Sequence, residues 1–263
     1  MQFSKADILA LDPSLFSLED KSALIRHLYG DAKEWTWKSD LQTKLRFAWR
    51  WEELKSSAEP KGKPFYVNFD QLCLAAKKNP PGVFSPTVSA FTDWIFRLYF
   101  PPKENVSLRN GKLVEREIAR RHIPLLTHDR WKLIHDGRGD GSDDGMNISP
   151  LAIKNTLMRG SPDLVLREKR TGKILIVELK ATNREAPTDG WPNLQAQLWA
   201  YSQIDAFQDA PEIILAGEIW GFALPRLTWK RTVRWKKGDV ALEQRCTLLF
   251  NIYKSHIESA RNS

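Results

Sequence analysis

The segment 160–180 constrains the fold more than any other part of the chain. Two apolar, β-branched runs flank the polar turn 169–173, which contains a glycine. This pattern predicts a β-hairpin. Because side chains alternate along a strand, Glu178 and Lys180 share one face of the second predicted strand.

The register of this hairpin decides which residues meet at its open end. If the turn is centred on residues 170–171, Asp163 lies opposite Glu178. A type I turn followed by a left-handed bulge at Gly172 would instead place Asp163 opposite Leu179. Two facing carboxylates about 4 Å apart repel by roughly 4 kcal/mol at an effective dielectric near 20. The first register therefore predicts a bound cation, whereas the simpler alternative is a half-exposed hairpin with charged ends.

The composition is typical of a soluble globular protein, with 42% hydrophobic and 27% charged residues among 263. No apolar stretch approaches the roughly 20 residues needed to span a bilayer. The N-terminus lacks a basic region followed by an apolar core. We therefore expect no membrane contact and a cytoplasmic location. Cys73 and Cys246 are the only cysteines, so they are expected to be reduced and buried rather than part of a four-cysteine metal site.

Basic residues gather near the C-terminus of a chain whose formal net charge is +8. The stretch 226–237 contains no acidic residue and interleaves Trp229 and Trp235 with its Lys and Arg. Bases between aromatic residues can bind phosphates and stacked nucleobases together, although a charge-protected edge strand has the same pattern. The residues predicted to contact nucleic acid are Lys230, Arg231, Arg234, Trp235, Lys236 and Lys237.

Two regions are predicted, with a boundary near the helix-breaking pair Pro101-Pro102. Residues 1–104 have mainly helical periodicity, including a helix over 89–99, and no assigned role. Residues 105–263 form the second region. Its predicted order is a helix (107–122), a strand (130–135), the hairpin, a helix (192–207), a strand (213–224), the basic segment and a closing helix (240–258).

Two short motifs in the second region resemble those of a known nuclease family. Pro162-Asp163, followed 15 residues later by Glu178-Leu179-Lys180, resembles the signature of the PD-(D/E)xK nuclease superfamily. The segment 197–201, Gln-Leu-Trp-Ala-Tyr, resembles the QxxxY motif of its RecB-like branch. The resemblance covers roughly 105–225. It implies an α/β, restriction-endonuclease-like core of helix, mixed central sheet with β-hairpin, helix and strand, preceded by the helical N-terminal region.

The same resemblance implies a metal site built on acids. The family places an acid on its first core helix, where Glu115 fits the spacing and Glu117 is the reserve. Asp163 and Glu178 are then expected to bind Mg2+ or Mn2+, with Glu115 binding directly or through water. Lys180 would position the attacking water, help to deprotonate it and offset charge on the phosphate.

The helix that follows the hairpin provides an independent check. Pro192 suits its first turn, and Gln197 and Tyr201 are one turn apart, so they project together. A glutamine beside a buried stripe needs a polar partner. The resemblance implies that this pair orients Lys180 or the scissile phosphate, whereas the alternative is a glutamine that caps a backbone group beside a packed tyrosine.

The function expected from these features is Mg2+-dependent hydrolysis of DNA, in repair, recombination or defence against foreign DNA. Two alternatives remain open: a non-catalytic nucleic-acid-binding or assembly subunit on the same fold, and an RNA-directed nuclease. The chain holds no helicase motor, which leaves room for a partner protein that supplies targeting.

Overall fold

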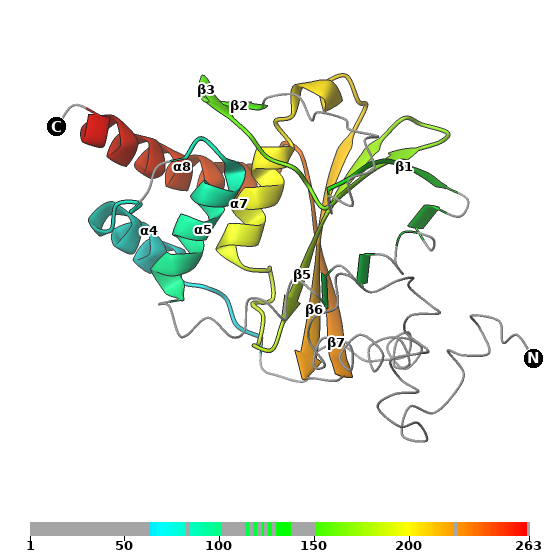
Figure 1. Cartoon of the computed structure of the whole chain (residues 1–263), viewed down its shortest axis with the longest axis horizontal. Coiled ribbons are helices and arrows are strands. Elements are labelled where there is room, and N and C mark those ends of the chain that lie inside the picture. The colour runs from blue at the N-terminus through cyan, green and yellow to red at the C-terminus, as the bar shows by residue number, and fades with distance from the viewer. Residues whose placement is uncertain are drawn as a thin grey trace, which may run out of the picture.

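The fold is α/β, with a mixed five-stranded sheet and helices gathered beside it (Figure 1). A part of the predicted N-terminal helical region, and Glu117, lie outside the residues that the structure describes. The computed structural model describes residues 64–82, 85–100, 114–115, 118–119, 123, 126–127, 130–137, 151–223 and 226–261.

The strands of the main sheet follow the spatial order β1-β4-β5-β6-β7. Strands β5 and β6 are parallel, and the other neighbours are antiparallel. Strands β2 and β3 form a separate small hairpin. The bounds are β1 (Trp131–Asp136), β2 (Leu151–Ile153), β3 (Thr156–Met158), β4 (Leu164–Glu168), β5 (Ile174–Thr182), β6 (Ile213–Ala223) and β7 (Arg226–Lys236).

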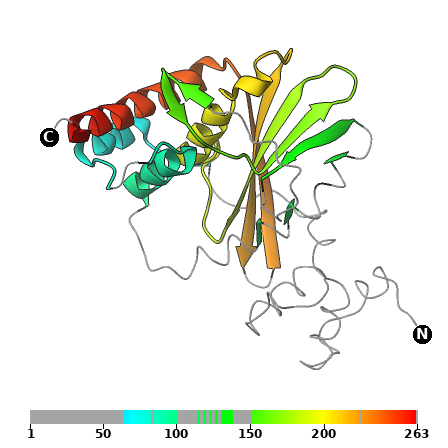
Figure 2. The same ribbon diagram turned by 45° about the horizontal axis from the view of Figure 1, so that its top comes forward.

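The helices α4, α5, α7 and α8 lie together on one side of the sheet (Figure 2). The side chains of Asn68 and Thr87 cap α4 and α5 by accepting from backbone N–H groups of the first turn, and Pro192 occupies the first turn of α7. The bounds are α4 (Phe69–Lys78), α5 (Val88–Tyr99), α7 (Pro192–Tyr201), the 3-10 helix η2 (Asp205–Phe207) and α8 (Val240–Arg261). The described parts of 114–127 are also helical.

The β4–β5 hairpin has the first of the two registers considered above. Leu164 lies opposite Val177, so the next facing pair at the open end is Asp163 and Glu178. Gly172 has a positive φ of 75°, as a bulge would require, and glycine tolerates this backbone conformation. The strands nevertheless keep the unshifted pairing, which brings the two acids together.

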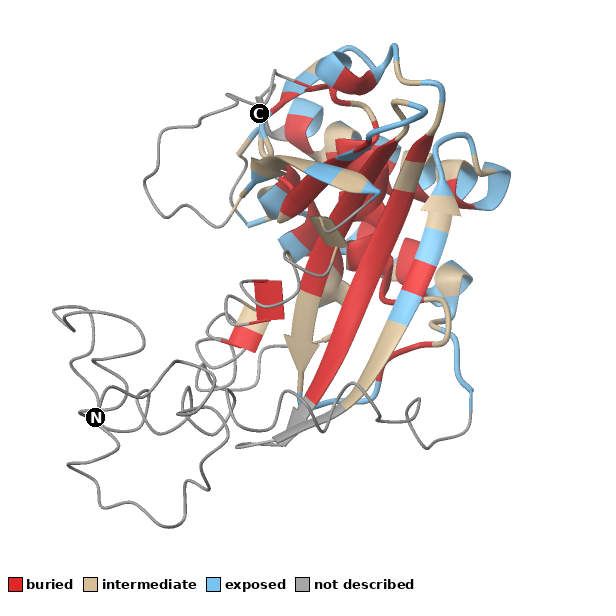
Figure 3. Ribbon diagram, turned by 90° about the vertical axis from the view of Figure 1, so that its right-hand side faces the viewer, coloured by how far each residue is buried: buried red, intermediate tan, exposed pale blue. Residues whose placement is uncertain are grey.

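Two apolar clusters pack against opposite faces of the sheet. One joins the face that includes Val165 and Ile176 to the four helices, and the other joins Val177 and Leu179 to Val114, Ile118 and Ala119. Both central strands, β5 and β6, are therefore buried over most of their length, whereas edge strand β7 alternates in exposure (Figure 3). A strand buried on both faces has a nearly continuous apolar sequence.

Helices α4 and α5 belong to the same apolar cluster as α7 and α8. Phe91 of α5 is fully buried, and its ring centroid lies 5.3 Å from that of Phe250 and 5.2 Å from that of Tyr253. The boundary between residues 104 and 105 stays a prediction. The described part of the N-terminal region nevertheless packs on the second region, because the two share one core.

The structure shortens one predicted helix and shows that the basic segment forms a strand. The helix predicted to reach residue 207 ends at Tyr201, where the Ser202 hydroxyl donates to the Trp199 carbonyl at 2.6 Å and competes with the helical backbone pattern. The predicted basic segment is an edge strand, β7. Cys73 and Cys246 are free and buried as expected, and no helix of the described part is long and apolar enough to cross a bilayer.

We expect Phe91→Ala to lower the free energy of unfolding by about 3–5 kcal/mol, because it empties a large site in the shared core. Urea denaturation followed by tryptophan fluorescence and by circular dichroism measures this change. Asp93→Ala, on an exposed position of the same helix, is the matched control. A loss confined to one of two separate unfolding steps would contradict a single shared core.

Candidate active site at the open end of the β4–β5 hairpin

Glu178 is the centre of the site. Glu178 is only 2% exposed, because it lies in a central strand covered on both faces. A buried carboxylate requires polar partners. Its Oε1 atom accepts hydrogen bonds from Lys180 Nζ at 2.7 Å and from Gln197 Nε2 at 2.6 Å. Gln197 is predicted to need a polar partner, and that partner is Glu178, the acid predicted to bind metal.

Asp163 lies directly beside Glu178. Its backbone N–H points to Glu178 Oε2, with an N···O distance of 3.4 Å. Its own carboxylate accepts from the Leu179 N–H, with Oδ2 at 2.7 Å. Strand β5 continues past the start of β4, so this N–H has no strand partner there, and the Asp163 side chain takes that place.

Glu115 reaches the same edge of β5 from the other face of the sheet. The adjoining Val114 is packed with Leu179 in the second apolar cluster. Glu115 Oε1 accepts from the Ala181 N–H at 2.9 Å. Alternate N–H groups of a strand point to the same side, so the acids at 163 and 115 bind consecutive free donors along one edge.

Helix α7 supplies the polar pair predicted from its spacing. Gln197 Nε2 lies 3.2 Å from the Tyr201 hydroxyl. That hydroxyl donates to the Ser161 carbonyl at 3.0 Å, which fixes the approach to β4. Gly160 permits this contact, because a Cβ atom there would lie 2.7 Å from the Tyr201 ring and 2.7 Å from Val88.

Burial and crowding of acids set the charge state of the site. Burial of the Glu178 carboxyl, together with the negative charge of Asp163, raises its pKa to about 8 even though Lys180 acts in the opposite direction. For Lys180, burial alone would lower the pKa, but the carboxylates of Glu178, Glu115 and Asp163 outweigh it and raise the pKa. Lys180 is therefore an ammonium group at neutral pH.

All three carboxylates of the site are already engaged by protein donors. Asp163 Oδ2, Glu178 Oε1 and Glu115 Oε1 all accept hydrogen bonds from protein donors. Among the residues that the structure describes, no three His, Cys, Asp or Glu side chains already form a group that could enclose a metal ion. The oxygens suited to a cation are thus spread along a strand edge rather than arranged as a cage.

Two pairs near the site were not found from the sequence. The Tyr99 hydroxyl of α5 donates to Asn193 Oδ1 of α7, and His135 Nε2 of β1 lies 2.9 Å from Ser161 Oγ. Asn193 precedes Gln197 by one turn, so helix spacing alone would have placed it on the same face. Tyr99 and His135 lie in distant segments, and no local pattern marks them.

The residues predicted to bind nucleic acid on β7 are divided between the two faces of the sheet. Arg231 and Trp235 face the helices: Arg231 Nη1 donates to the Ala186 and Pro187 carbonyls at 2.7 Å and 2.9 Å, and Trp235 packs on the core. These two side chains hold the loop before α7 and the edge of the core in place.

The remaining basic residues of this set differ in whether they already have a partner within the protein. Lys230 pairs with Glu218 at 3.1 Å and lies over the Trp220 ring, at 4.5 Å from its centroid. Lys236 pairs with Glu212, and Lys237 contacts Gln208. Arg234 is exposed and has no polar partner among the described residues. Fewer of the predicted side chains are therefore without another partner than the sequence pattern implies.

The fold has a weak similarity to a solved nuclease structure. No protein-family model matches the sequence, and no curated protein matches it significantly. Among the solved structures that match is an alkaline exonuclease from Laribacter hongkongensis, with 14% sequence identity and a TM-score of 0.32. The match covers 73% of this chain and 90% of that one. A similarity of this strength does not identify a function.

We expect Glu178→Gln to change how stability depends on pH when metal is chelated. The folded pKa of about 8 lies above the ordinary glutamate value of about 4.3. The contribution of Glu178 to the wild-type free energy of unfolding is therefore fully present below about pH 4 and is lost as pH rises towards 8. The variant does not titrate, so its stability relative to wild type should rise by about 1–4 kcal/mol between pH 5 and 9.

Urea denaturation in EDTA at pH 5, 7 and 9 measures this difference. Glu185→Gln replaces an exposed glutamate in the loop after β5 and is the matched control. A difference between Glu178→Gln and wild type that stays constant with pH would show that the Glu178 carboxyl is not crowded.

Proposed function

We propose that this chain is a metal-dependent nuclease that hydrolyses phosphodiester bonds of DNA. The observation that carries the proposal is the convergence of Asp163, Glu178 and Lys180 at the open end of one hairpin, with Gln197 bound to Glu178. Two adjacent acids and an ammonium group supply the charges that phosphodiester hydrolysis requires. The motifs that resemble the PD-(D/E)xK superfamily contain these same residues.

The donor set fits a hard divalent cation such as Mg2+ or Mn2+. Asp163 and Glu178 are neighbours whose mutual repulsion helps to raise the Glu178 pKa, and a cation between them would remove that repulsion. Mg2+ binds through few protein carboxylates and keeps several waters, so it does not need a complete cage. Asp163 and Glu178 would hold the ion, with Glu115 binding it directly or through water.

When bound, such an ion polarises the phosphoryl group and lowers the pKa of a coordinated water. Besides the ion, the Lys180 ammonium group brings a positive charge to the site. Because its pKa is raised, its ammonium group donates hydrogen bonds to the attacking water or to a phosphate oxygen and offsets developing negative charge. We therefore assign Lys180 to positioning and charge neutralisation rather than to proton abstraction.

Gln197 acts through Glu178, and Tyr201 acts through the segment that leads into Asp163. Gln197 donates to the same carboxylate oxygen as Lys180, which restricts the orientation of that carboxylate. Tyr201 binds the Ser161 carbonyl and so holds the segment that leads into Asp163. Both are positioning residues, and the exposed Arg234 of β7 is the remaining candidate of the predicted set for a phosphate contact remote from the site.

We expect Lys180→Ala to reduce DNA cleavage by about 100-fold or more, because groups that act on protons or charge in the transition state contribute at least that much. The assay is digestion of linear, circular and single-stranded DNA, and of RNA, with Mg2+, Mn2+ or EDTA. Lys169→Ala, on the exposed turn of the same hairpin, is the control. Wild-type cleavage by a folded Lys180→Ala protein would refute the assignment.

We expect saturating Mg2+ to raise the melting temperature, because a ligand at about 100 times its Kd adds roughly 2.7 kcal/mol of stability. Asp163→Asn should abolish this response while raising stability in EDTA, since it removes one of two crowded charges. Its amide oxygen can still accept from the Leu179 N–H. Differential scanning fluorimetry against Mg2+ concentration measures both effects, and an unresponsive wild type would count against the metal site.

A further inference from the structure

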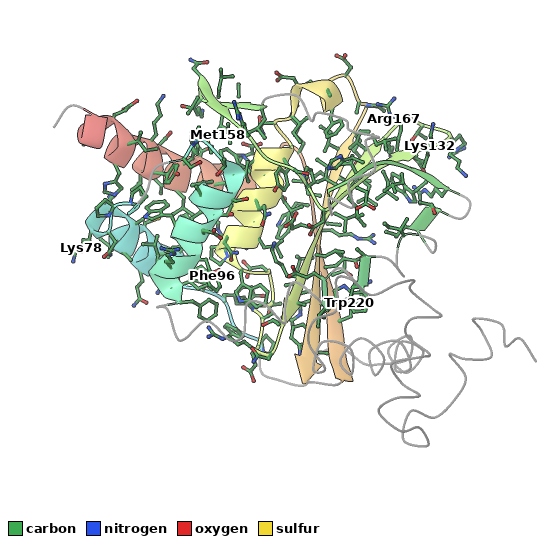
Figure 4. All side chains as sticks on the ribbon, in the orientation of Figure 1. Lys78, Phe96, Lys132, Met158, Arg167 and Trp220 are labelled. Carbon is green, nitrogen blue, oxygen red and sulfur yellow. The ribbon has the colours of Figure 1, made fainter. Side chains whose placement is uncertain are left out.

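Three aromatic side chains form a half-buried surface at the C-terminal end of α5. We call Phe96, Tyr99 and Phe100 the aromatic platform. Their ring centroids lie 5.8 Å apart for Phe96 and Tyr99, 5.1 Å for Phe96 and Phe100, and 4.8 Å for Tyr99 and Phe100. Each side chain is only partly covered, unlike Phe91 and Trp94 of the same helix, which are buried. Figure 4 marks Phe96 at this end of α5.

The aromatic platform is joined to the candidate active site through α7. The Tyr99 hydroxyl donates to Asn193, which lies one helical turn before Gln197, the partner of Glu178. Burial raises the pKa of the Tyr99 phenol, while Asn193 and the nearby Lys180 ammonium act in the opposite direction. The C-terminal ends of α5 and β5 also lie at the same end of the molecule (Figure 1).

A cationic side chain covers part of the platform. The Arg184 guanidinium lies 4.7 Å from the centroid of the Phe100 ring, and Arg184 is exposed in the loop that follows β5. It has no carboxylate partner among the described residues. Several basic residues of β7 are instead engaged in ion pairs or backbone contacts. Among the described residues, Arg184 therefore places a positive charge without a carboxylate partner against the aromatic platform.

We propose that the aromatic platform and Arg184 bind unpaired nucleotides of a single-stranded segment next to the scissile phosphate. This inference rests on the proposed nuclease function. Aromatic rings stack on the faces of nucleobases, and an arginine nearby binds the backbone phosphate. In a duplex those faces are already stacked on neighbouring bases, so a platform of this kind selects single strands or unwound ends.

The test is a binding cycle that separates stacking from phosphate contacts. A fluorescein-labelled single-stranded DNA 12-mer and a backbone-matched abasic 12-mer are titrated with the full chain in EDTA, and anisotropy gives each Kd. Phe100→Leu keeps an apolar side chain but removes the ring. Trp131→Leu is the matched control, because Trp131 also carries an arginine over its ring, at 5.3 Å from Arg130, on the distant strand β1.

Wild type should bind the base-containing strand about 10- to 100-fold more tightly than the abasic strand. Phe100→Leu should reduce that ratio at least fivefold and leave binding of the abasic strand unchanged, whereas Trp131→Leu should change neither. Arg184→Gln should weaken binding of both strands and lower the slope of log affinity against log salt by about 0.7. Arg170→Gln, in the exposed hairpin turn, is its control.

An unchanged ratio in Phe100→Leu would overturn the inference, as would wild-type protein that cleaves DNA but binds both strands equally. Neither result would affect the proposed nuclease function, which the Lys180→Ala cleavage assay tests separately. Failure of wild type to bind or cleave any nucleic acid would remove both. Thermal melting of each variant shows whether the protein is folded.

Discussion

The site depends on a single buried carboxylate. Glu178 interrupts the apolar sequence of β5 at a place where the sheet is covered on both faces. Burying an ionised carboxylate without partners is very costly, so its neighbours are constrained. Lys180 and Gln197 must both reach Oε1, which fixes the orientation of β5 relative to α7. An unpartnered acid at this position would instead disrupt the core.

The other two acids have a structural role that must be separated from metal binding. Where β5 extends past β4, its N–H groups at 179 and 181 have no strand partner, and Asp163 and Glu115 accept from them. An unsatisfied donor at such an edge costs about 1–3 kcal/mol. Variants that keep an acceptor, such as asparagine or glutamine, therefore separate chemistry from stability better than alanine.

What the sequence could predict is local. The hairpin and the pairing of Gln197 with Tyr201 follow from spacing along one strand or one helix, whereas the sequence left two hairpin registers open and the structure decides between them. Division of the β7 residues between two faces also follows from strand alternation, once the edge-strand alternative is chosen for that segment. The partnership of Tyr99 with Asn193 is different, because it depends on how α5 packs on α7, and nothing local encodes that contact.

Helix α7 differs from a surface helix, which buries one apolar face and exposes the opposite face. This helix is buried on nearly every side, since α5, α8 and the sheet all pack against it, and so it has no single apolar face. Its polar residues are consequently informative: Asn193, Gln197 and Tyr201 recur at four-residue intervals. Each bonds a different segment, namely α5, β5 and the approach to β4. One face of α7 thus links α5, which carries most of the aromatic platform, to the hairpin that carries Asp163 and Glu178.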